Sequence, residues 1–139
     1  MPPGLRAWEW MKDWSNGINS IDLAAICART AEEKKGEEIR VLDMEGVFPM
    51  ADYFVLATGA NRKHIQSITE AIVKTLKGEE KLPLSREGYG QGWWVLVDYG
   101  DVVVHILSQE ARKFYDLENL WGDAQDVDWS GMKPRETGS

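Results

Sequence analysis

Asp98, Asp101 and His105 form the cluster whose residue types could support catalysis. Carboxylates at a strand end can hold the divalent cation that neutralises phosphate charge in nucleotidyl transfer. Turn chemistry is the alternative interpretation, because Asp98 and Asp101 flank a predicted tight hairpin, where Asp is locally favoured. We expect the turn, and a divalent-metal nucleotidyltransferase using Asp98 and Asp101 stays as the alternative function.

The conformation of the hairpin decides which side chain lies beside His105. Tyr99 disfavours positive φ, so we expect a three-residue loop ending in a left-handed Gly100 over a two-residue Tyr99-Gly100 turn. The three-residue loop would place Trp93 opposite His105, and the two-residue turn would place Trp94 opposite it. Both registers put an indole beside the imidazole, which favours a packing or interface role for His105.

Other chemical motifs are absent from the sequence. The Gly-rich stretch Gly88–Gly92 precedes a predicted strand, whereas phosphate-binding loops follow a strand and open a helix. The common hydrolase and zinc signatures are missing. Cys27 lies on an apolar helical pattern and is expected to be a buried hydrophobe, and His64 is expected to face the surface. We predict no catalytic residue, no cofactor and no metal ligand.

Periodicity and turn signals predict the elements that would position these residues. The expected order is a helix from Ser20 to Lys35, strands Ile39–Met44 and Tyr53–Thr58, a helix from Asn61 to Gly78, a short strand Leu84–Glu87, strands Trp93–Val97 and Val102–Leu107, and a helix from Ser108 through about Trp121, stopped by Gly122. This order indicates an α/β fold with a mixed, roughly five-stranded sheet and packed helices.

Composition indicates one domain and argues against several classes of partner. With 43% hydrophobic and 28% charged residues, the chain is typical of a globular domain. We place that domain at residues 20–129, between a Trp-rich N-terminal extension (1–19) and a tail (130–139) expected to be mobile. The net charge of −7 disfavours general nucleic-acid binding and fits a basic protein partner. The absence of a membrane-spanning pattern and the single cysteine predict a cytoplasmic protein without membrane contact.

The C-terminal half carries more aromatic side chains than a core of this size needs. They are Trp93, Trp94, Tyr99, Phe114, Tyr115, Trp121 and Trp129. Between Phe114 and Ser130 the chain has five carboxylates and no Lys or Arg, which is also typical of a solvated acidic end. Large aromatics ringed by carboxylates favour a protein interface.

Two long segments resemble the ribosomal silencing factors, the Iojap or YbeB-like family. They are the string Trp94–Leu107 and the string Glu110–Trp121, and the upstream segments Asp52–Gly59 and Arg62–Ile65 match the same family. The resemblance spans roughly Ile21 to Trp121.

This resemblance implies a nucleotidyltransferase-like architecture, although the Gly-Ser and Asp-x-Asp catalytic motif of that fold is absent here. It also implies binding to ribosomal protein L-fourteen on the large ribosomal subunit, which blocks joining of the small subunit when nutrients are scarce. This is steric exclusion without a chemical step, and a homodimer is expected for the free protein. Motif positions give seven candidate partner-binding residues: Trp94, Leu96, Asp98, Asp101, His105, Arg112 and Tyr115.

Overall fold

The computed structural model describes residues 19–116, 119 and 122–130 of the chain. Its elements, in chain order, are α2 (Ser20–Glu33), β1 (Glu37–Asp43), β2 (Tyr53–Gly59), α3 (Arg62–Gly78), β3 (Ser85–Glu87), β4 (Trp94–Asp98), β5 (Val102–Ser108), α4 (Gln109–Tyr115) and β6 (Gln125–Val127). Residues 1–18, most of the predicted N-terminal extension, and residues 131–139 of the predicted tail lie outside the described residues.

The two longer helices form because capping residues and apolar periodicity agree. The Asn19 side chain accepts a hydrogen bond from Asp22 N at 2.9 Å, so Asn19 caps α2, and the predicted cap Ser20 is instead its first residue. Asn61 caps α3 as predicted, by accepting from His64 N at 2.8 Å. The buried side of α3 carries Ile65, Ile68, Thr69, Ile72 and Leu76, which recur at helical spacing.

The strands form one mixed sheet in the order β3-β4-β5-β2-β1-β6. The neighbours β2 and β5 are parallel, and the other pairs are antiparallel. The mixed α/β prediction is therefore confirmed, with one strand more than the five expected. The sixth is the edge strand β6, which lies in the acidic segment and pairs with β1.

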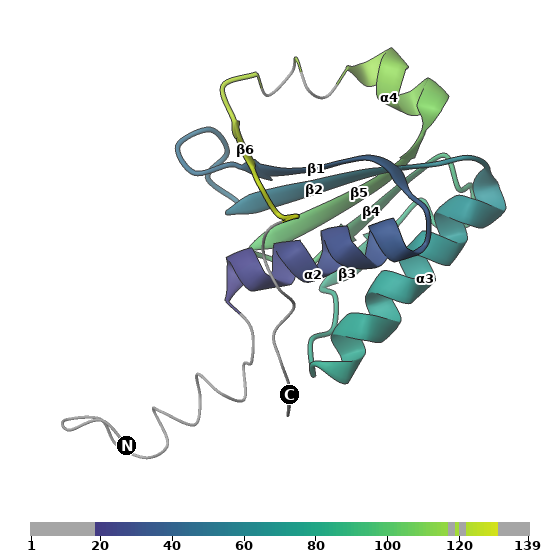
Figure 1. The fold of residues 1–139 in the computed structure, drawn as a ribbon, viewed down its shortest axis with the longest axis horizontal. Helices are drawn as coiled ribbons and strands as arrows, with labels where there is room; N and C mark the ends of the chain where they lie inside the picture. The colour runs from purple at the N-terminus through teal and green to yellow at the C-terminus, as the bar shows by residue number, and fades with distance from the viewer. Residues whose placement is uncertain (1–18, 117–118, 120–121, 131–139) are drawn as a thin grey trace.

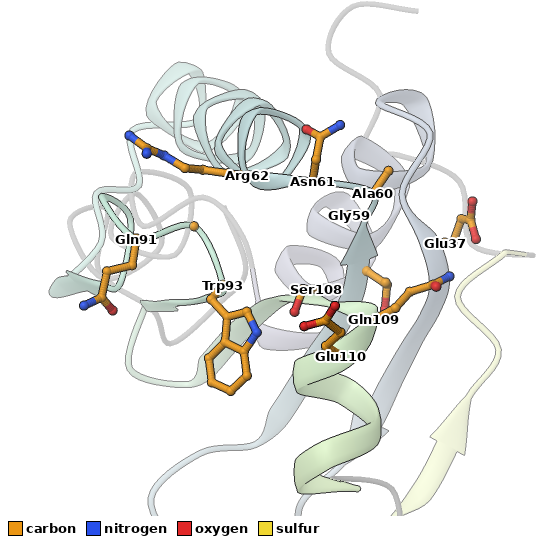
Figure 2. Close-up of a pocket in the computed structure, with 12 residues that line it drawn as sticks. Glu37, Gly59, Ala60, Asn61, Arg62, Gln91, Trp93, Ser108, Gln109 and Glu110 are labelled. Atoms are coloured by element: carbon orange, nitrogen blue, oxygen red, sulfur yellow. The ribbon is translucent and has the colours of Figure 1, made fainter.

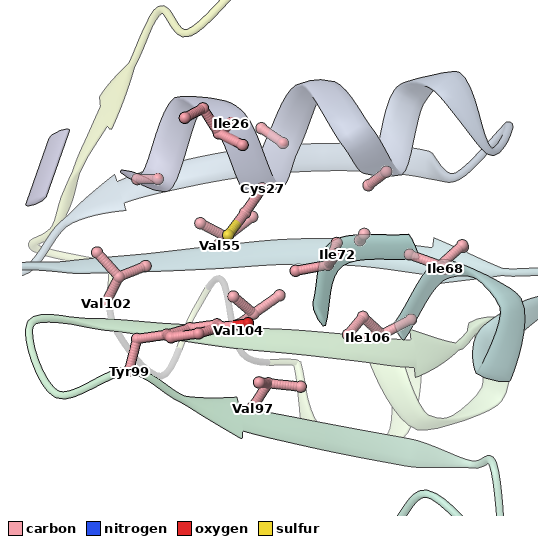
Figure 3. Packing of buried hydrophobic residues seen from close by; sticks show 14 of the residues in the cluster. Ile26, Cys27, Val55, Ile68, Ile72, Val97, Tyr99, Val102, Val104 and Ile106 are labelled. Atoms are coloured by element: carbon pink, nitrogen blue, oxygen red, sulfur yellow. The ribbon is translucent and has the colours of Figure 1, made fainter. Parts of the chain in front are cut away.

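Strand alternation divides the side chains of the sheet between two faces. On β4 and β5, Val95, Val97, Val102, Val104 and Ile106 belong to the larger core under α2 and α3. Figure 3 shows Cys27 pointing from α2 toward the sheet, beside Val55 of β2, and it is fully buried, as predicted. On the other face, a smaller cluster forms beneath α4, which lies on the opposite side of the sheet from α2 and α3 (Figure 1).

The hairpin register differs from both predicted registers. Leu96 pairs with His105, and Asp98 pairs with Val103. Tyr99 N donates to Val102 O at 2.9 Å, so the turn is centred on Gly100-Asp101, with Gly100 at φ 90°. Positive φ at the first central residue is typical of a type II′ turn, in which glycine takes that position.

The helix predicted to run from Ser108 through about Trp121 is shorter in the structure. Ser108 does cap α4, by accepting from Ala111 N at 3.0 Å. The helix ends at Tyr115 because Asp116 takes a left-handed conformation, with φ 47° and ψ 56°. Trp121 lies outside the described residues, and Gly122 follows a turn in which its N–H bonds to Asn119 O.

None of the described helices is both long enough and apolar enough to span a lipid bilayer.

Candidate functional site

An apolar groove crosses the face of the sheet that α2 and α3 leave open. Its volume is about 580 Å³. The groove is lined by Phe48, Met50, Phe54, Leu84, Trp94, Leu96, Asp98, Gly100, Val103 and His105. Met50 and Leu84 at its rim are 75% and 74% exposed. Exposed apolar side chains gathered around a concave surface are typical of a binding site for another molecule.

Alternate residues of β4, β5 and β2 point to the open face of the sheet and line the groove. Trp94, Leu96 and Asp98 are every second residue of β4 and therefore point to the open face, as Val103 and His105 do from β5. Phe54, at the start of β2, contributes the next row. These positions face away from the larger core, so the same alternation that buries Val95 and Val97 presents an indole and an aliphatic side chain outward.

A hydrogen bond fixes the central indole of the groove. Trp94 Nε1 donates to His105 Nδ1 at 3.1 Å, and the Phe54 ring lies 4.8 Å from the imidazole. His105 is only 3% exposed, and burial lowers its pKa to about 4, so the imidazole is neutral at physiological pH. The predicted contact between an indole and His105 is confirmed, although it is diagonal across the ladder.

A row of aromatic rings in contact, which we call the aromatic tier, continues from the groove to α4. The Tyr115 ring lies 4.8 Å from Trp94, 5.7 Å from Trp93 and 5.0 Å from Phe114. Phe114 is 77% exposed, so this tier ends in an aromatic side chain directed to solvent. Partly exposed aromatic side chains with rigid neighbours are the type that contributes most energy at protein interfaces.

Carboxylates collect at the end of the sheet where the β4–β5 turn lies, and we call them the acidic rim: Asp43, Glu45, Asp52, Asp98 and Asp101. Asp98 is the member that lines the groove, and Asp43, Asp52 and Glu45 lie near Tyr53. The carbonyl of Asp101 accepts from Asp52 N at 2.7 Å and from Tyr53 N at 3.1 Å, which holds the hairpin turn against the start of β2. The pKa of Tyr53 is raised by burial and by the charges of Asp43, Asp52 and Glu45. An acidic rim beside an apolar groove suits a basic partner.

Arg112 holds α4 on the sheet and has almost no exposed surface. It is 5% exposed, and its Nη1 donates to Thr58 Oγ1 at 3.0 Å. Its Nε lies 3.9 Å from Glu38 Oε2. Glu38 has a φ of 49° and lies at the irregularity in the pairing of β1 with β2.

Only some of the seven predicted partner-binding residues line the groove. Trp94, Leu96 and Asp98 line the groove, His105 lies in its floor, Tyr115 flanks Trp94, and Asp101 is exposed at the adjoining turn. Arg112 lies beneath α4, away from the groove lining. In this conformation His105 and Arg112 have little surface with which to contact a partner, and their contacts instead position Trp94 and α4.

Sequence reasoning missed five apolar side chains of the groove: Phe48, Met50, Phe54, Leu84 and Val103. Met50 and Leu84 lie in loops, where large apolar side chains without periodicity are a weak signal of an exposed surface. Phe54 belongs to a continuous apolar strand, and its sequence does not tell which face is open.

A second, more polar hollow lies at the carboxyl ends of β2 and β5, and we call it the end cleft (Figure 2). Its volume is about 500 Å³, and residues around the starts of α3 and α4, including Asn61, Arg62 and Gln109, line it. Asp98 and Asp101 are at the opposite end of the sheet, beside the first residue of β5. The seven residues of β5 separate them from the end cleft by roughly 20 Å.

Asp98 and Asp101, the residues of the nucleotidyltransferase alternative, lie at the hairpin turn between β4 and β5. Asp98 Oδ1 accepts from Gly100 N at 2.7 Å, which is the turn chemistry expected from the sequence. Within residues 19–116, 119 and 122–130, no group of three His, Cys, Asp or Glu side chains is arranged to hold a metal ion.

Comparison with known proteins gives a consistent result. A protein-family model described as "Ribosomal silencing factor during starvation" matches residues 18–139, and so extends past Trp121, where the sequence resemblance was placed. The "Ribosomal silencing factor RsfS" of Halalkalibacterium halodurans is 38% identical over 116 residues, which cover 83% of this chain and 98% of that protein. The protein of the same name from Bacillus subtilis is 41% identical over 108 residues, covering 77% of this chain and 91% of that protein. A crystal structure of a Chromobacterium violaceum protein superposes with a TM-score of 0.74 at 28% identity, over 88% of this chain and 100% of that chain.

Proposed function

Because the chain belongs to the ribosomal silencing factor family, we propose that it binds the large ribosomal subunit through ribosomal protein L-fourteen and thereby blocks joining of the small subunit. The observation that supports a binding function most directly is the apolar groove with its acidic rim. Repression of translation under nutrient limitation then follows from occupancy of one surface, without a chemical step.

The groove has the composition of a protein-docking surface. Trp94 is fixed by His105 and Tyr115, so its position is set before a partner arrives, which reduces the entropy lost on binding. Met50 and Leu84 can exclude water around a partner side chain placed against Trp94. This arrangement supports a small, specific contact with an apolar centre.

The acidic rim supports a basic partner over the nucleic acid that surrounds ribosomal proteins. A net charge of −7 repels a phosphate backbone, whereas carboxylates beside the groove attract Lys and Arg. We further propose that the protein is cytoplasmic, that it contacts no membrane and no nucleic acid in general, and that the free protein is a homodimer.

Two leucines of one loop provide a matched experiment. Leu84 lines the groove and is 74% exposed, whereas Leu82 is 64% exposed and is not part of the groove lining. Leu84→Glu is expected to weaken co-sedimentation with isolated large subunits at least about tenfold, because a carboxylate would be desolvated in an apolar contact. Leu82→Glu carries the same charge change and is expected to bind as the unchanged protein does. Equal loss in both variants, or in neither, would remove the groove as the docking site.

A further inference from the structure

The apolar groove has a volume of about 580 Å³, and the chain carries three indoles before Asn19, its first described residue. Trp8, Trp10 and Trp14 lie in residues 1–18, close to Leu5 and Met11. The family match begins at residue 18, so this segment lies almost entirely outside it. The match to the Halalkalibacterium halodurans relative covers 98% of that protein but 83% of this chain. The Trp-rich segment is therefore a feature of this chain beyond the shared domain.

The start of α2 lies at the same end of the sheet as the acidic rim and the hairpin turn. Only the short turn Lys34–Gly36 separates α2 from β1, so the two run antiparallel, and the start of α2 lies near Asp43, the last residue of β1. Asp43 pairs with Tyr53, and Tyr53 pairs with Val102, beside the hairpin turn. The groove residues Phe54, Asp98, Gly100 and Val103 are at this end. Asn19, the first described residue, therefore lies at the same end of the sheet as these groove residues.

The chain before Asn19 is long enough to pass from one face of the sheet to the other. An extended chain spans at most about 3.3–3.6 Å per residue, so Trp14 can lie up to roughly 17 Å from Asn19, and Trp8 up to roughly 38 Å. Packed layers lie about 10 Å apart, so the path from the α2 layer past the sheet to its open face is longer than one such spacing. Trp8 has the length to reach the groove around the turn end of the sheet, whereas Trp14 is close to its limit.

Charge does not decide the placement. Residues 1–18 carry Arg6 and Lys12 but also Glu9 and Asp13, so their side chains have no net charge. A tether of this length gives an effective concentration in the millimolar range, which makes even a weak contact significant.

We propose that residues 1–18 dock into the apolar groove of their own molecule through Trp side chains and occlude it. Docking within the molecule is supported by the apolar groove, by the length of the chain before Asn19 and by the Trp-rich composition of that segment. Its consequence, that the segment competes with the ribosomal partner, rests on the proposed function.

The test uses the full chain and its single native cysteine. Cys27 is fully buried and burial raises its pKa, so a nitroxide reagent will label only a new thiol introduced by Ala7→Cys. The label is expected to broaden the NMR signals of Met50, Leu84 and Val103 and to leave those of Glu70 and Lys74, on the outer side of α3, sharp. Trp8→Ala/Trp10→Ala/Trp14→Ala in the labelled chain is expected to abolish the broadening.

Two further experiments separate the possible outcomes. In the first, spin-labelled chains without isotope are mixed with isotope-labelled chains without a spin label. Broadening of the groove signals in that mixture would show that the segment of a second copy occupies the groove, and would overturn the proposal. Absence of broadening at the groove in the singly labelled chain would overturn it as well. The triple Trp variant is expected to bind large subunits about threefold to tenfold more tightly, because its groove is open. Broadening without any gain in affinity would leave self-docking standing and would contradict the placement of the ribosomal partner on the groove.

Discussion

Trp94 Nε1 donates a hydrogen bond to His105 Nδ1 at 3.1 Å, so the indole at the centre of the groove is oriented by a buried imidazole. Nδ1 can accept this bond only without a proton, and burial lowers the pKa of His105 to about 4. The neutral imidazole and the position of Trp94 are therefore linked.

The first prediction concerns stability against pH. Unfolded histidine titrates near 6.5 and folded His105 near 4, so between these values the unfolded chain holds a proton that the folded chain does not. The stability that depends on neutral His105 is complete above pH 6.5 and is lost as the pH falls to 4, by up to about 1.4 kcal/mol per pH unit. Urea unfolding at pH 7, 6 and 5 should show a smaller loss in His105→Gln than in the unchanged chain. Parallel losses in the two proteins would contradict the assignment.

A second prediction compares two glycines of one loop. Gly88 has a φ of 81°, and a Cβ there would lie 2.1 Å from the carbonyl oxygen of Trp94, whereas a Cβ at Gly90 meets nothing within 4 Å. Gly88→Ala should lower the free energy of unfolding by about 2 kcal/mol or more, since the clash is with backbone beside the central indole. Gly90→Ala should change it by less than about 0.5 kcal/mol. Chemical denaturation of both variants measures the difference, and similar values would be incompatible with this loop conformation.

The third prediction concerns the attachment of α4. Arg112→Ala removes a buried guanidinium and leaves Thr58 Oγ1 without this donor, which should cost about 2–3 kcal/mol of stability. Lys113→Ala, at the exposed neighbouring position, should cost less than about 0.5 kcal/mol. Thermal unfolding checks both values. A surface role for Arg112 would show instead as unchanged stability with weakened binding to the large subunit.

The acidic rim gives a fourth prediction, on the rate of association. If its carboxylates steer a basic partner, the association rate constant with large subunits should fall as salt rises, and Asp52→Asn/Asp101→Asn should make that fall shallower. Glu32→Gln/Glu33→Gln removes the same charge from the end of α2 and serves as the control. Stopped-flow measurements at several ionic strengths compare the slopes. Steering by net charge alone would give both variants the same slope.

Sequence periodicity predicted the main layers because each signal there is local. Asn61 and the apolar spacing of α3 define that helix, and the alternation of Val95 and Val97 defines β4. The hairpin register could not be decided from the turn residues alone, since each of Tyr99, Gly100 and Asp101 has a plausible turn position. Burial of Tyr99 on the same face as Val97 selects Gly100-Asp101, and this depends on the helices packed against that face.

The edge strand β6 depends on contacts distant in sequence. Arg40 makes two hydrogen bonds to the Asp126 carboxylate, at 2.8 and 2.7 Å, across 86 residues, and these bonds lower the pKa of Asp126. An acidic segment read on its own indicates a solvated end, because its partner on β1 is not visible locally. The groove itself was predicted only in part, because Met50 and Leu84 reach it from loops.

The central claim is that the apolar groove carries the activity by which subunit joining is blocked. Purified small and large subunits are mixed with the protein, and the formation of whole ribosomes is followed by light scattering. The unchanged chain and Leu82→Glu should suppress joining in proportion to the amount added, and Leu84→Glu should require at least about ten times more protein. Undiminished joining with the unchanged chain, or equal suppression by both leucine variants, would contradict the account.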